Sequence, residues 1–366
     1  DPFLPKKVEE GRLEDIRECI GCNICYSGDS LGVPIRCTQN PTMGEEWRRG
    51  WHPERIAPAH APESVLVVGA GPAGLEAARA LGQRGYDVTL AEATDRLGGR
   101  VDHEARLPGL AQWRRVADHR EWQLSQMPNV ATYLESALDA GQVLDFGADH
   151  VAIATGSRWC PEGIGREAHE AIPRDTGARV LTPDDIMAGA RPDGPVIVYD
   201  DDHYYMGGVM AELLRAEGHA VSYVTPAADV SHWTHNTLEQ ERIQRRLMEA
   251  GVDIVPLHAL SEIGCGSVTL ECVYTEREHE IPAAAVVMVT MRLPEETLFR
   301  RVEAAIARGA PAPRSLTRIG DCLGPGSIAA AVWSGHRFAR ELGETPDPDA
   351  VPFRRELPCL DGDPPR

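Results

Sequence analysis

One short stretch constrains the fold of this chain more than any other. Val65–Val68 is fully apolar, Leu75–Leu81 is rich in Ala and Leu, and the residues between them read Gly69-Ala70-Gly71-Pro72-Ala73-Gly74, a G-x-G-x-x-G pattern. Gly85 then ends the predicted helix, and Tyr86–Ala91 predicts a second strand. Between a strand and a helix, such glycines permit a tight turn, a close approach of pyrophosphate to the backbone, and packing of helix against strand. The stretch therefore predicts a Rossmann-like βαβ unit.

The residues after this unit extend the predicted nucleotide site. Glu92 ends the second strand, where a carboxylate that binds the adenosine ribose is expected. Gly98 and Gly99 fit a second close approach of the backbone to a ligand. Arg100 would pair with a phosphate or form a surface salt bridge.

Four cysteines near the start of the chain form a second pattern, C-x2-C-x2-C-x11-C. They are Cys19, Cys22, Cys25 and Cys37. Three closely spaced thiolates and a fourth from a distance are typical of a [4Fe–4S] cluster, whereas zinc is more often held by two separated pairs of ligands. The spacing favours the cluster over a zinc knuckle or cysteines without a ligand.

A second βαβ pattern has a different turn. Pro195–Tyr199 and Ala220–Val224 predict strands on either side of a helix at Gly207–Ala216, but the turn reads DDDHYYMGG. Its carboxylates, Asp200 to Asp202, would repel pyrophosphate, and the two tyrosines after them would block its approach. We expect a nucleotide-binding shape that has lost its site. A metal bound at the Asp cluster is the alternative.

Together these patterns predict an α/β chain with an iron–sulfur loop module and two Rossmann-like three-layer domains of the FAD/NAD(P)-binding type, one inserted in the other. Further strands are expected at Asp149–Ala154, Ala285–Thr290 and Leu316–Ile319, with a helix at Ser327–Leu342. The predicted boundaries are 1–60 for the cluster module and linker, 61–175 plus 286–345 for the ADP/FAD-binding domain, 176–285 for the inserted NAD(P)-type domain with a degenerate site, and 346–366 for an extended C-terminal tail.

Composition narrows the function classes. A net charge of −19 argues against binding to nucleic acid or to an anionic membrane surface. The other five cysteines are scattered along 366 residues, which predicts reduced thiols and a cytoplasmic protein. The chain begins DPFLPKK without a methionine, so we expect a portion of a longer polypeptide.

Weaker signals are assigned structural roles. His232 and His235 lie three residues apart, but we find no carboxylate or cysteine close to them in sequence, and a structural or surface role is expected rather than metal binding. Trp47 and Trp51 are expected to pack rather than to face a partner. No residue is predicted to be catalytic.

At this point the motifs resemble a known family. CIGCNIC, RCTQNPTMGEEWRRGWHPE, VLVVGAGPAGLEAAR, LGGR, LPGL, AIATGSRW and RIGD, in this order, are similar to the C-terminal half of the iron–sulfur flavoprotein amine dehydrogenases. That group includes the trimethylamine, dimethylamine and histamine dehydrogenases, with the 2,4-dienoyl-CoA reductases as a more distant branch. The cysteine loop and the run after it are specific to the group, whereas the glycine motif is not.

The resemblance implies a set of cofactors and sites. Cys19, Cys22, Cys25 and Cys37 would hold a [4Fe–4S] cluster. ADP, or FAD in its place, would bind in the first Rossmann-like domain. Its site would comprise the glycine turn, Glu92, Gly99, the Thr155-Gly156 turn and Asp321. FMN and the amine pocket would lie on an N-terminal (β/α)8 barrel.

The function implied is that of the electron-transfer half of an amine dehydrogenase. It would pass electrons from FMN through the cluster to an electron-transferring flavoprotein, as a homodimer with structurally bound ADP. The acidic turn favours this branch. One alternative is the FAD-containing portion of an NAD(P)H-dependent enoyl or dienoyl reductase, and another is a non-catalytic, zinc-bearing interaction module.

Overall fold

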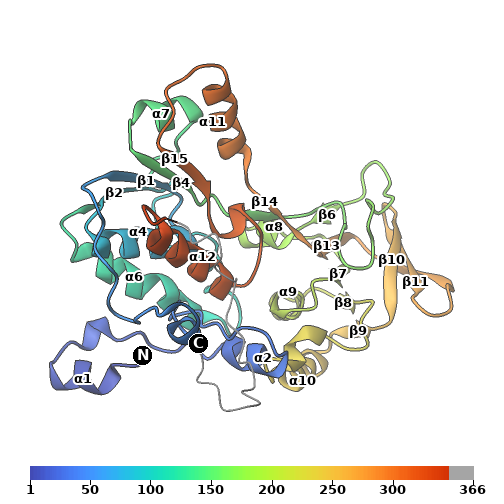
Figure 1. Ribbon diagram of the computed structural model, residues 1–366. Coiled ribbons are helices and arrows are strands. Elements are labelled where there is room, and N and C mark those ends of the chain that lie inside the picture. The colour runs from blue at the N-terminus through green and yellow to red at the C-terminus, as the bar shows by residue number, and fades with distance from the viewer. Residues whose placement is uncertain (346–366) are drawn as a thin grey trace, which may run out of the picture.

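The computed structural model describes residues 1–345 (Figure 1). The predicted tail, 346–366, lies outside the described residues.

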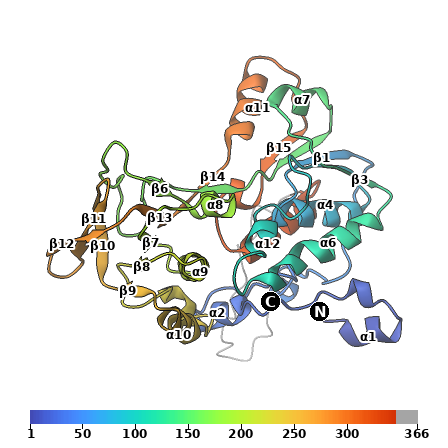
Figure 2. The same ribbon diagram turned by 180° about the vertical axis from the view of Figure 1, so that it is seen from behind.

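The first 63 residues consist of loops and short helices. The helices are α1 (Leu4–Glu9), η1 (Leu13–Asp15), α2 (Ile24–Ser30) and α3 (Glu45–Arg49). In both views α2 lies beside α10 (Gln240–Ala250), far away in sequence (Figures 1 and 2). The side-chain amide of Asn23, next to α2, donates to the carbonyl oxygen of Thr237 at 2.8 Å. The cysteine loop is therefore held against the second half of the chain.

A first parallel sheet is built around β1 (Ser64–Val68), as the apolar run predicts. Its order is β15 (Ser315–Arg318), β4 (His150–Ile153), β1, β2 (Asp87–Ala91) and β3 (Val130–Tyr133). Val65 and Val67 pack with α4 (Pro72–Arg84) and α12 (Ile328–Glu341) on one face. Leu66 and Val68 pack on the other face, with α7 (Ala140–Asp145) and α11 (Thr297–Ala307). Because side chains alternate along a strand and both faces are covered, a continuous apolar run is what this position requires.

The chain that follows β4 forms a second parallel sheet before it returns to the first through β15. The order is β6 (Val180–Leu181), β13 (Ala285–Val289), β7 (Val196–Asp200), β8 (Val221–Val224) and β9 (Asp253–Val255). On one face lie the helices α8 (Pro183–Met187), α9 (Tyr205–Ala216) and α10, with η3 (His232–His235) between β8 and α10. On the other face packs an antiparallel meander, β10 (His258–Ile263), β11 (Ser267–Cys272) and β12 (Glu278–Pro282).

Two connections join the sheets. β5 (Ser157–Trp159) and β14 (Arg292–Pro294) pair antiparallel where the chain leaves and re-enters the first sheet.

The remaining elements are α5 (Arg100–Glu104), η2 (Ala111–Arg114), α6 (Arg115–Ser125) and η4 (Gly320–Cys322). The predicted fold class, α/β with parallel Rossmann-like sheets, is confirmed, and the meander is an addition that the sequence analysis does not contain.

Candidate functional site

One pocket of about 1060 Å³ runs from the carboxyl ends of the first sheet to the cysteine loop. Most of the predicted nucleotide residues line it: Gly69, Ala70, Gly71, Pro72, Ala73, Glu92, Gly99, Arg100, Thr155, Gly156 and Asp321. Gly74 does not line the pocket. From the cysteine loop, Ile20, Cys22, Ile24 and Thr38 reach it. The two patterns found in the sequence therefore meet at one cavity.

The glycine turn places each of its three glycines in a different role. Gly69 has φ +102, and a Cβ there would lie 2.5 Å from the carbonyl oxygen of Ala154, the residue after the neighbouring strand β4. Gly71 caps α4, and a Cβ there would meet nothing within 4 Å. A Cβ on Gly74 would overlap the carbonyl oxygen of Gly69, so this glycine lets the helix approach the turn. Only Gly71 keeps the backbone open towards the pocket.

Glu92 supports the same turn from the end of β2. The backbone N–H of Ala70 donates to Oε2 of Glu92 at 2.8 Å, and the backbone N–H and hydroxyl of Thr94 donate to Oε1. The carboxylate is 7% exposed and borders the pocket. It is thus fixed in position beside the N-terminus of α4, where a ribose is expected in this fold.

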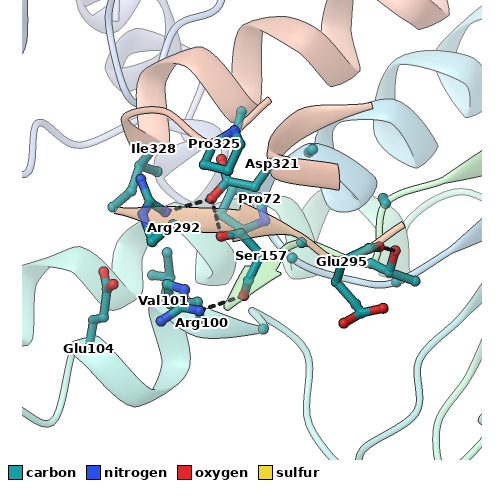
Figure 3. Close-up of a pocket in the computed structure, with 18 of the residues that line it drawn as sticks. Pro72, Arg100, Val101, Glu104, Ser157, Arg292, Glu295, Asp321, Pro325 and Ile328 are labelled. Carbon is teal, nitrogen blue, oxygen red and sulfur yellow. Dashed lines mark hydrogen bonds and ion pairs between the residues drawn. The ribbon is translucent and has the colours of Figure 1, made fainter. Parts of the chain in front are cut away.

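Asp321 lies at the opposite side of the pocket within a set of partners that the motifs do not reveal (Figure 3). Its Oδ2 accepts from the hydroxyl of Ser157 at 2.9 Å and from Nη1 of Arg292 at 2.6 Å, and its Oδ1 accepts from the backbone N–H of Gly326. Arg292 is the first residue of β14 and lies three positions beyond the end of β13. No sequence motif marks Arg292, although ligands of open α/β sheets bind near the carboxyl ends of strands, and this residue lies just beyond such an end.

Arg100 makes contacts on both sides of the pocket. Its guanidinium lies 2.5 Å from Oδ1 of Asp184, on α8, and donates to the carbonyl oxygen of Ser157 at 2.6 Å. The Arg100 side chain is 19% exposed, so this is a partly buried ion pair and not the surface salt bridge of the sequence analysis. The pair connects the first parallel sheet's helix α5 with the second sheet's helix α8.

Glu104 and Tyr205 form a buried polar pair at the floor of this region. The Tyr205 hydroxyl donates to Oε2 of Glu104 at 2.9 Å. Burial raises the pKa of Glu104 and raises that of Tyr205 well above its ordinary value. The pocket therefore combines arginines near its rim with a weakly acidic, buried pair beneath them.

The cysteine loop presents four thiols with hydrogen-bond donors around them. None of the four forms a disulfide. The backbone N–H of Gly21 donates to Sγ of Cys19 at 3.3 Å, and those of Gln39 and Asn40 donate to Sγ of Cys37 at 3.4 and 3.3 Å. Hydrogen bonds to sulfur stabilise thiolate ligands and tune the potential of iron–sulfur clusters.

The spacing of the sulfurs provides a test of the metal. Within residues 1–345, no three of these thiols have their sulfurs all within 4.8 Å of one another. In a tetrahedral zinc site with Zn–S bonds of about 2.3 Å, the sulfurs would lie only about 3.8 Å apart. As a set, the described sulfurs are thus more widely spaced than those of a tetrahedral zinc site.

A buried ionic network connects the cysteine loop to α4. Nη2 of Arg120 donates to the carbonyl oxygen of Gln39 at 3.2 Å, and Nε of Arg120 lies 2.8 Å from Oε2 of Glu76. Burial would raise the pKa of Glu76, but Arg79, Arg120 and a hydrogen bond from His336 hold it well below its usual range. The carboxylate therefore remains charged although it is buried.

His336 completes this network from α12. Its Nδ1 lies 2.8 Å from Oε1 of Glu76, while its Nε2 accepts a hydrogen bond from Nε of Arg340 at 2.9 Å. This arrangement requires the neutral imidazole with its proton on Nδ1. Burial lowers the pKa of His336 to about 4, in agreement with that state. Trp51 packs edge-on against the ring at 5.4 Å and is 8% exposed, as the packing role predicts, whereas Trp47 is 54% exposed.

The acidic turn of the second sheet is filled by its own side chains. Asp200 is fully buried, and its carboxylate accepts hydrogen bonds from the Tyr223 hydroxyl and the backbone N–H of His203. Burial raises the pKa of Asp200 to about 7. A Cβ on Gly207 would lie 2.5 Å from Cγ of Asp200, so the glycine makes room for this carboxylate at the start of α9.

Asp201 is also turned inwards, which corrects the expectation that all three carboxylates face a pyrophosphate position. Its Oδ2 accepts from the backbone N–H groups of Arg166 and Glu167, and its Oδ1 lies 3.3 Å from Nε2 of His203. Only Asp202 lines the pocket. Asp200 and Asp201 are both occupied by hydrogen-bond donors from within the chain, an arrangement that does not favour the alternative of a metal at the Asp cluster.

The pair His232 and His235 requires a correction as well. Asp229, three residues before His232, was overlooked in the sequence analysis, and its carboxylate lies 2.7 Å from a ring nitrogen of each histidine. The expectation that no carboxylate is close in sequence is wrong.

No helix within residues 1–345 is both long enough and apolar enough to cross a lipid bilayer.

Comparisons with known proteins agree with this geometry. Residues 67–136 match the model of an NAD(P)-binding Rossmann-like domain, and residues 181–284 match that of an OYE-like second alpha/beta domain. Dimethylamine dehydrogenase of Hyphomicrobium sp. (strain x) is 37% identical over 97% of this chain and 52% of its own length.

Solved structures extend the likeness. Histamine dehydrogenase from Rhizobium sp. 4-9 is 54% identical, with a TM-score of 0.95 over 99% of this chain and 56% of its own. The 6-hydroxypseudooxynicotine amine oxidase from Pseudomonas geniculata N1 is 48% identical, with a TM-score of 0.89 over 94% and 51%. The chain thus spans about half the length of the relatives it matches. In sequence and structure the chain corresponds to the C-terminal portion of dimethylamine and histamine dehydrogenase.

Proposed function

We propose that this chain forms the electron-transfer portion of an amine dehydrogenase, with a [4Fe–4S] cluster on Cys19, Cys22, Cys25 and Cys37 and a nucleotide in the pocket behind the glycine turn. The observation that carries the proposal is the shared cavity, because Cys22 and the glycine turn border the same space. A bound cluster would supply single-electron transfer. The chain's own part is to hold the four thiolates, donate N–H groups to them, and fix the loop through Arg120 and Asn23.

We further propose that the nucleotide is ADP. Gly71 would admit the pyrophosphate at the start of α4, and Glu92 would accept from the ribose. Asp321 and Glu92 each already accept three hydrogen bonds, so this count does not separate ADP from FAD. The choice of ADP follows the resemblance to the amine dehydrogenases, which the acidic turn of the second sheet favours. FAD is the second candidate, since a cavity of about 1060 Å³ is large for ADP alone.

An NAD(P)H-dependent reductase is less well supported. The turn after β7 is occupied by its own Asp200 and Asp201, so a second dinucleotide has no glycine-lined approach there. Because the chain leaves the first parallel sheet, builds the second and then returns through β15, we propose two domains. Residues 61–175 and 286–345 form the ADP/FAD-binding domain, and residues 176–285 form the inserted NAD(P)-type domain.

The family resemblance supports the wider assignment. We infer that FMN and the amine pocket lie on a (β/α)8 barrel in the rest of the protein. An electron-transferring flavoprotein would accept the electrons. The protein would act as a homodimer in the cytoplasm.

The decisive experiment analyses the contents of the chain. After anaerobic purification and denaturation, we expect about four irons and four acid-labile sulfides per chain and one released ADP. Cys37→Ser should lose the iron and keep the nucleotide, whereas Cys265→Ser, at an exposed thiol outside the loop, should keep both. A colourless chain without iron would overturn the cluster, zinc without sulfide would support an interaction module, and released FAD would replace ADP.

A further inference from the structure

The turn between β8 and α10 presents three potential metal ligands on one edge. Burial repeats every third residue there: Ser231, Thr234 and Thr237 are fully buried, while His232 and His235 are exposed. This is the period of a 3₁₀ helix, in which side chains at i and i+3 lie above one another. Both imidazoles therefore stand on the same solvent-facing edge of η3.

Asp229 places its carboxylate between the two rings. Its Oδ1 lies 2.7 Å from Nδ1 of His232, and its Oδ2 lies 2.7 Å from Nε2 of His235. The ligand atoms of the three residues are all within 4.8 Å of one another. The ring centroids are 5.2 Å apart. Two imidazole nitrogens and one carboxylate oxygen thus converge on a single small volume.

The backbone of this turn is held by buried contacts, so the ligands are positioned before any ion arrives. The N–H of Val230 donates to the side-chain oxygen of Gln244 at 3.1 Å, and the N–H of Ser231 donates to the Tyr223 hydroxyl at 2.9 Å. The N–H of Trp233 donates to the carbonyl oxygen of His203 at 2.8 Å. A ligand set on a fixed backbone loses little conformational entropy on binding.

We propose that Asp229, His232 and His235 bind one divalent first-row transition-metal ion, with zinc as the best match. Imidazole and carboxylate are ordinary zinc ligands, and a site with three protein ligands leaves a position for water. The histidine side chains are 55% and 48% exposed, so that position faces solvent. Each imidazole would carry its remaining proton on its other nitrogen, because the nitrogen that now donates to Asp229 would bind the ion.

This site would stabilise the contact between the second sheet and the cysteine loop. Trp233, between the two histidines, packs edge-on against Tyr204 at 4.8 Å, and Thr237 accepts the hydrogen bond from Asn23. An ion that joins Asp229 to both histidines would restrain the turn from which these contacts arise. The proposal is independent of which nucleotide fills the pocket.

The test counts zinc bound by the full chain, free of any affinity tag, with iron already in the cysteine loop. Equilibrium dialysis against Zn²⁺ should give one equivalent more for the wild type than for the double variant His232→Asn and His235→Asn. His279→Asn, which removes an exposed histidine from β12, should behave as the wild type. The cysteine loop is the same in all three proteins and cancels in the comparison. Equal zinc content in the wild type and the double variant would overturn the proposal.

Two further measurements cover the case in which the double variant fails to fold. Asp229→Asn alone should weaken zinc binding at least about tenfold. Loss of a group that only hydrogen-bonds to a metal ligand already weakens metal binding by about that factor, and Asp229 would bind the ion itself. With Cu²⁺ as the probe, the wild-type electron paramagnetic resonance spectrum should show coupling to two imidazole nitrogens. A spectrum without nitrogen coupling would reject the site.

Discussion

At the scale of single residues, Glu76 shows how this molecule keeps a charge in its interior. The carboxylate is 1% exposed and is contacted by Arg79, Arg120 and His336. Removal of one partner from such a group leaves a buried charge without compensation, which costs about 3–5 kcal/mol. Since Arg120 also binds the backbone of Gln39, the same network supports the loop that carries Cys37.

His336 makes the stability of this network dependent on pH. Burial lowers the pKa of His336 from 6.5 to about 4 in the folded chain. Above pH 6.5 the imidazole is neutral in both the folded and the unfolded chain. As the pH falls from 6.5 towards 4, only the unfolded chain takes up the proton, so the folded chain loses stability. Between about pH 7 and about pH 5, we expect the free energy of unfolding to fall by about 2 kcal/mol through this residue. Urea unfolding at the two pH values measures it.

The matched variants separate His336 from other titrating groups. His336→Gln should show a smaller loss of stability on acidification than the wild type, and His279→Gln, at an exposed position, should show the same loss as the wild type. An unchanged pH dependence in His336→Gln would contradict the assignment of a neutral, buried imidazole.

Single residues were also where sequence reasoning reached its limit. Local motifs predicted Glu92 and the glycine turn, because strand, turn and helix follow one another along the chain. Asp184 and Arg292 reach the pocket from other parts of the fold, and no spacing rule connects them to the glycine motif. Asp200 was recognised as an obstacle to pyrophosphate, but its inward direction depends on Tyr223, which only the fold brings near.

At the scale of elements, the start of α4 separates two kinds of glycine. Gly74 packs against the turn, and Gly71 faces the cavity. Alanine stabilises a helix by about 1 kcal/mol relative to glycine within the helix, so a loss of stability at Gly74 would report a steric effect. Gly71 is the N-cap of α4, where glycine is favoured over alanine.

We expect different results from alanine at these two positions. Gly74→Ala should lower the free energy of unfolding by about 3 kcal/mol, because its Cβ would overlap the carbonyl oxygen of Gly69. Gly71→Ala should lower the free energy of unfolding by only about 1 kcal/mol, because alanine is a poorer N-cap than glycine. It should weaken binding of added ADP at least about tenfold, because its Cβ enters the pyrophosphate position. Thermal unfolding and isothermal titration calorimetry provide the two readouts. Equal ADP affinity in Gly71→Ala and wild type would place the ligand elsewhere.

The strands of the two sheets were predictable for a physical reason. Apolar runs such as Val65–Val68 and Ala285–Val289 are covered on both faces, so their sequences carry a strong signal. The meander β10–β12 was not predicted, since none of its strands is a continuous buried apolar run. Glu278–Pro282 contains no buried residue and includes two glutamates. Its order comes from packing against the second sheet.

At the scale of the whole molecule, the two parallel sheets are connected across the pocket by Arg100 and Asp184 (Figure 3 shows Arg100). The pair lies beside the β5–β14 connection, since the backbone N–H of Trp159 also donates to Asp184. We infer that this contact contributes to the relative orientation of the two halves of the cavity.

A double-mutant cycle measures this connection. Arg100→Met and Asp184→Asn, alone and together, should give a coupling energy of about 1 kcal/mol, since the pair is only partly shielded from solvent. The pair Arg179 and Asp193, with side chains 40% and 95% exposed, is the matched control and should give a coupling near zero. Equal coupling in both pairs would mean that Arg100 and Asp184 add nothing specific between the sheets.

The carboxylate of Asp200 has a consequence for the history of the second sheet. Because Gly207, Tyr223 and the N–H of His203 all fit around this carboxylate, exchanging the aspartate for glycine would leave a cavity and a Tyr223 hydroxyl without its acceptor. Recovery of a dinucleotide there would need several simultaneous substitutions, each harmful by itself.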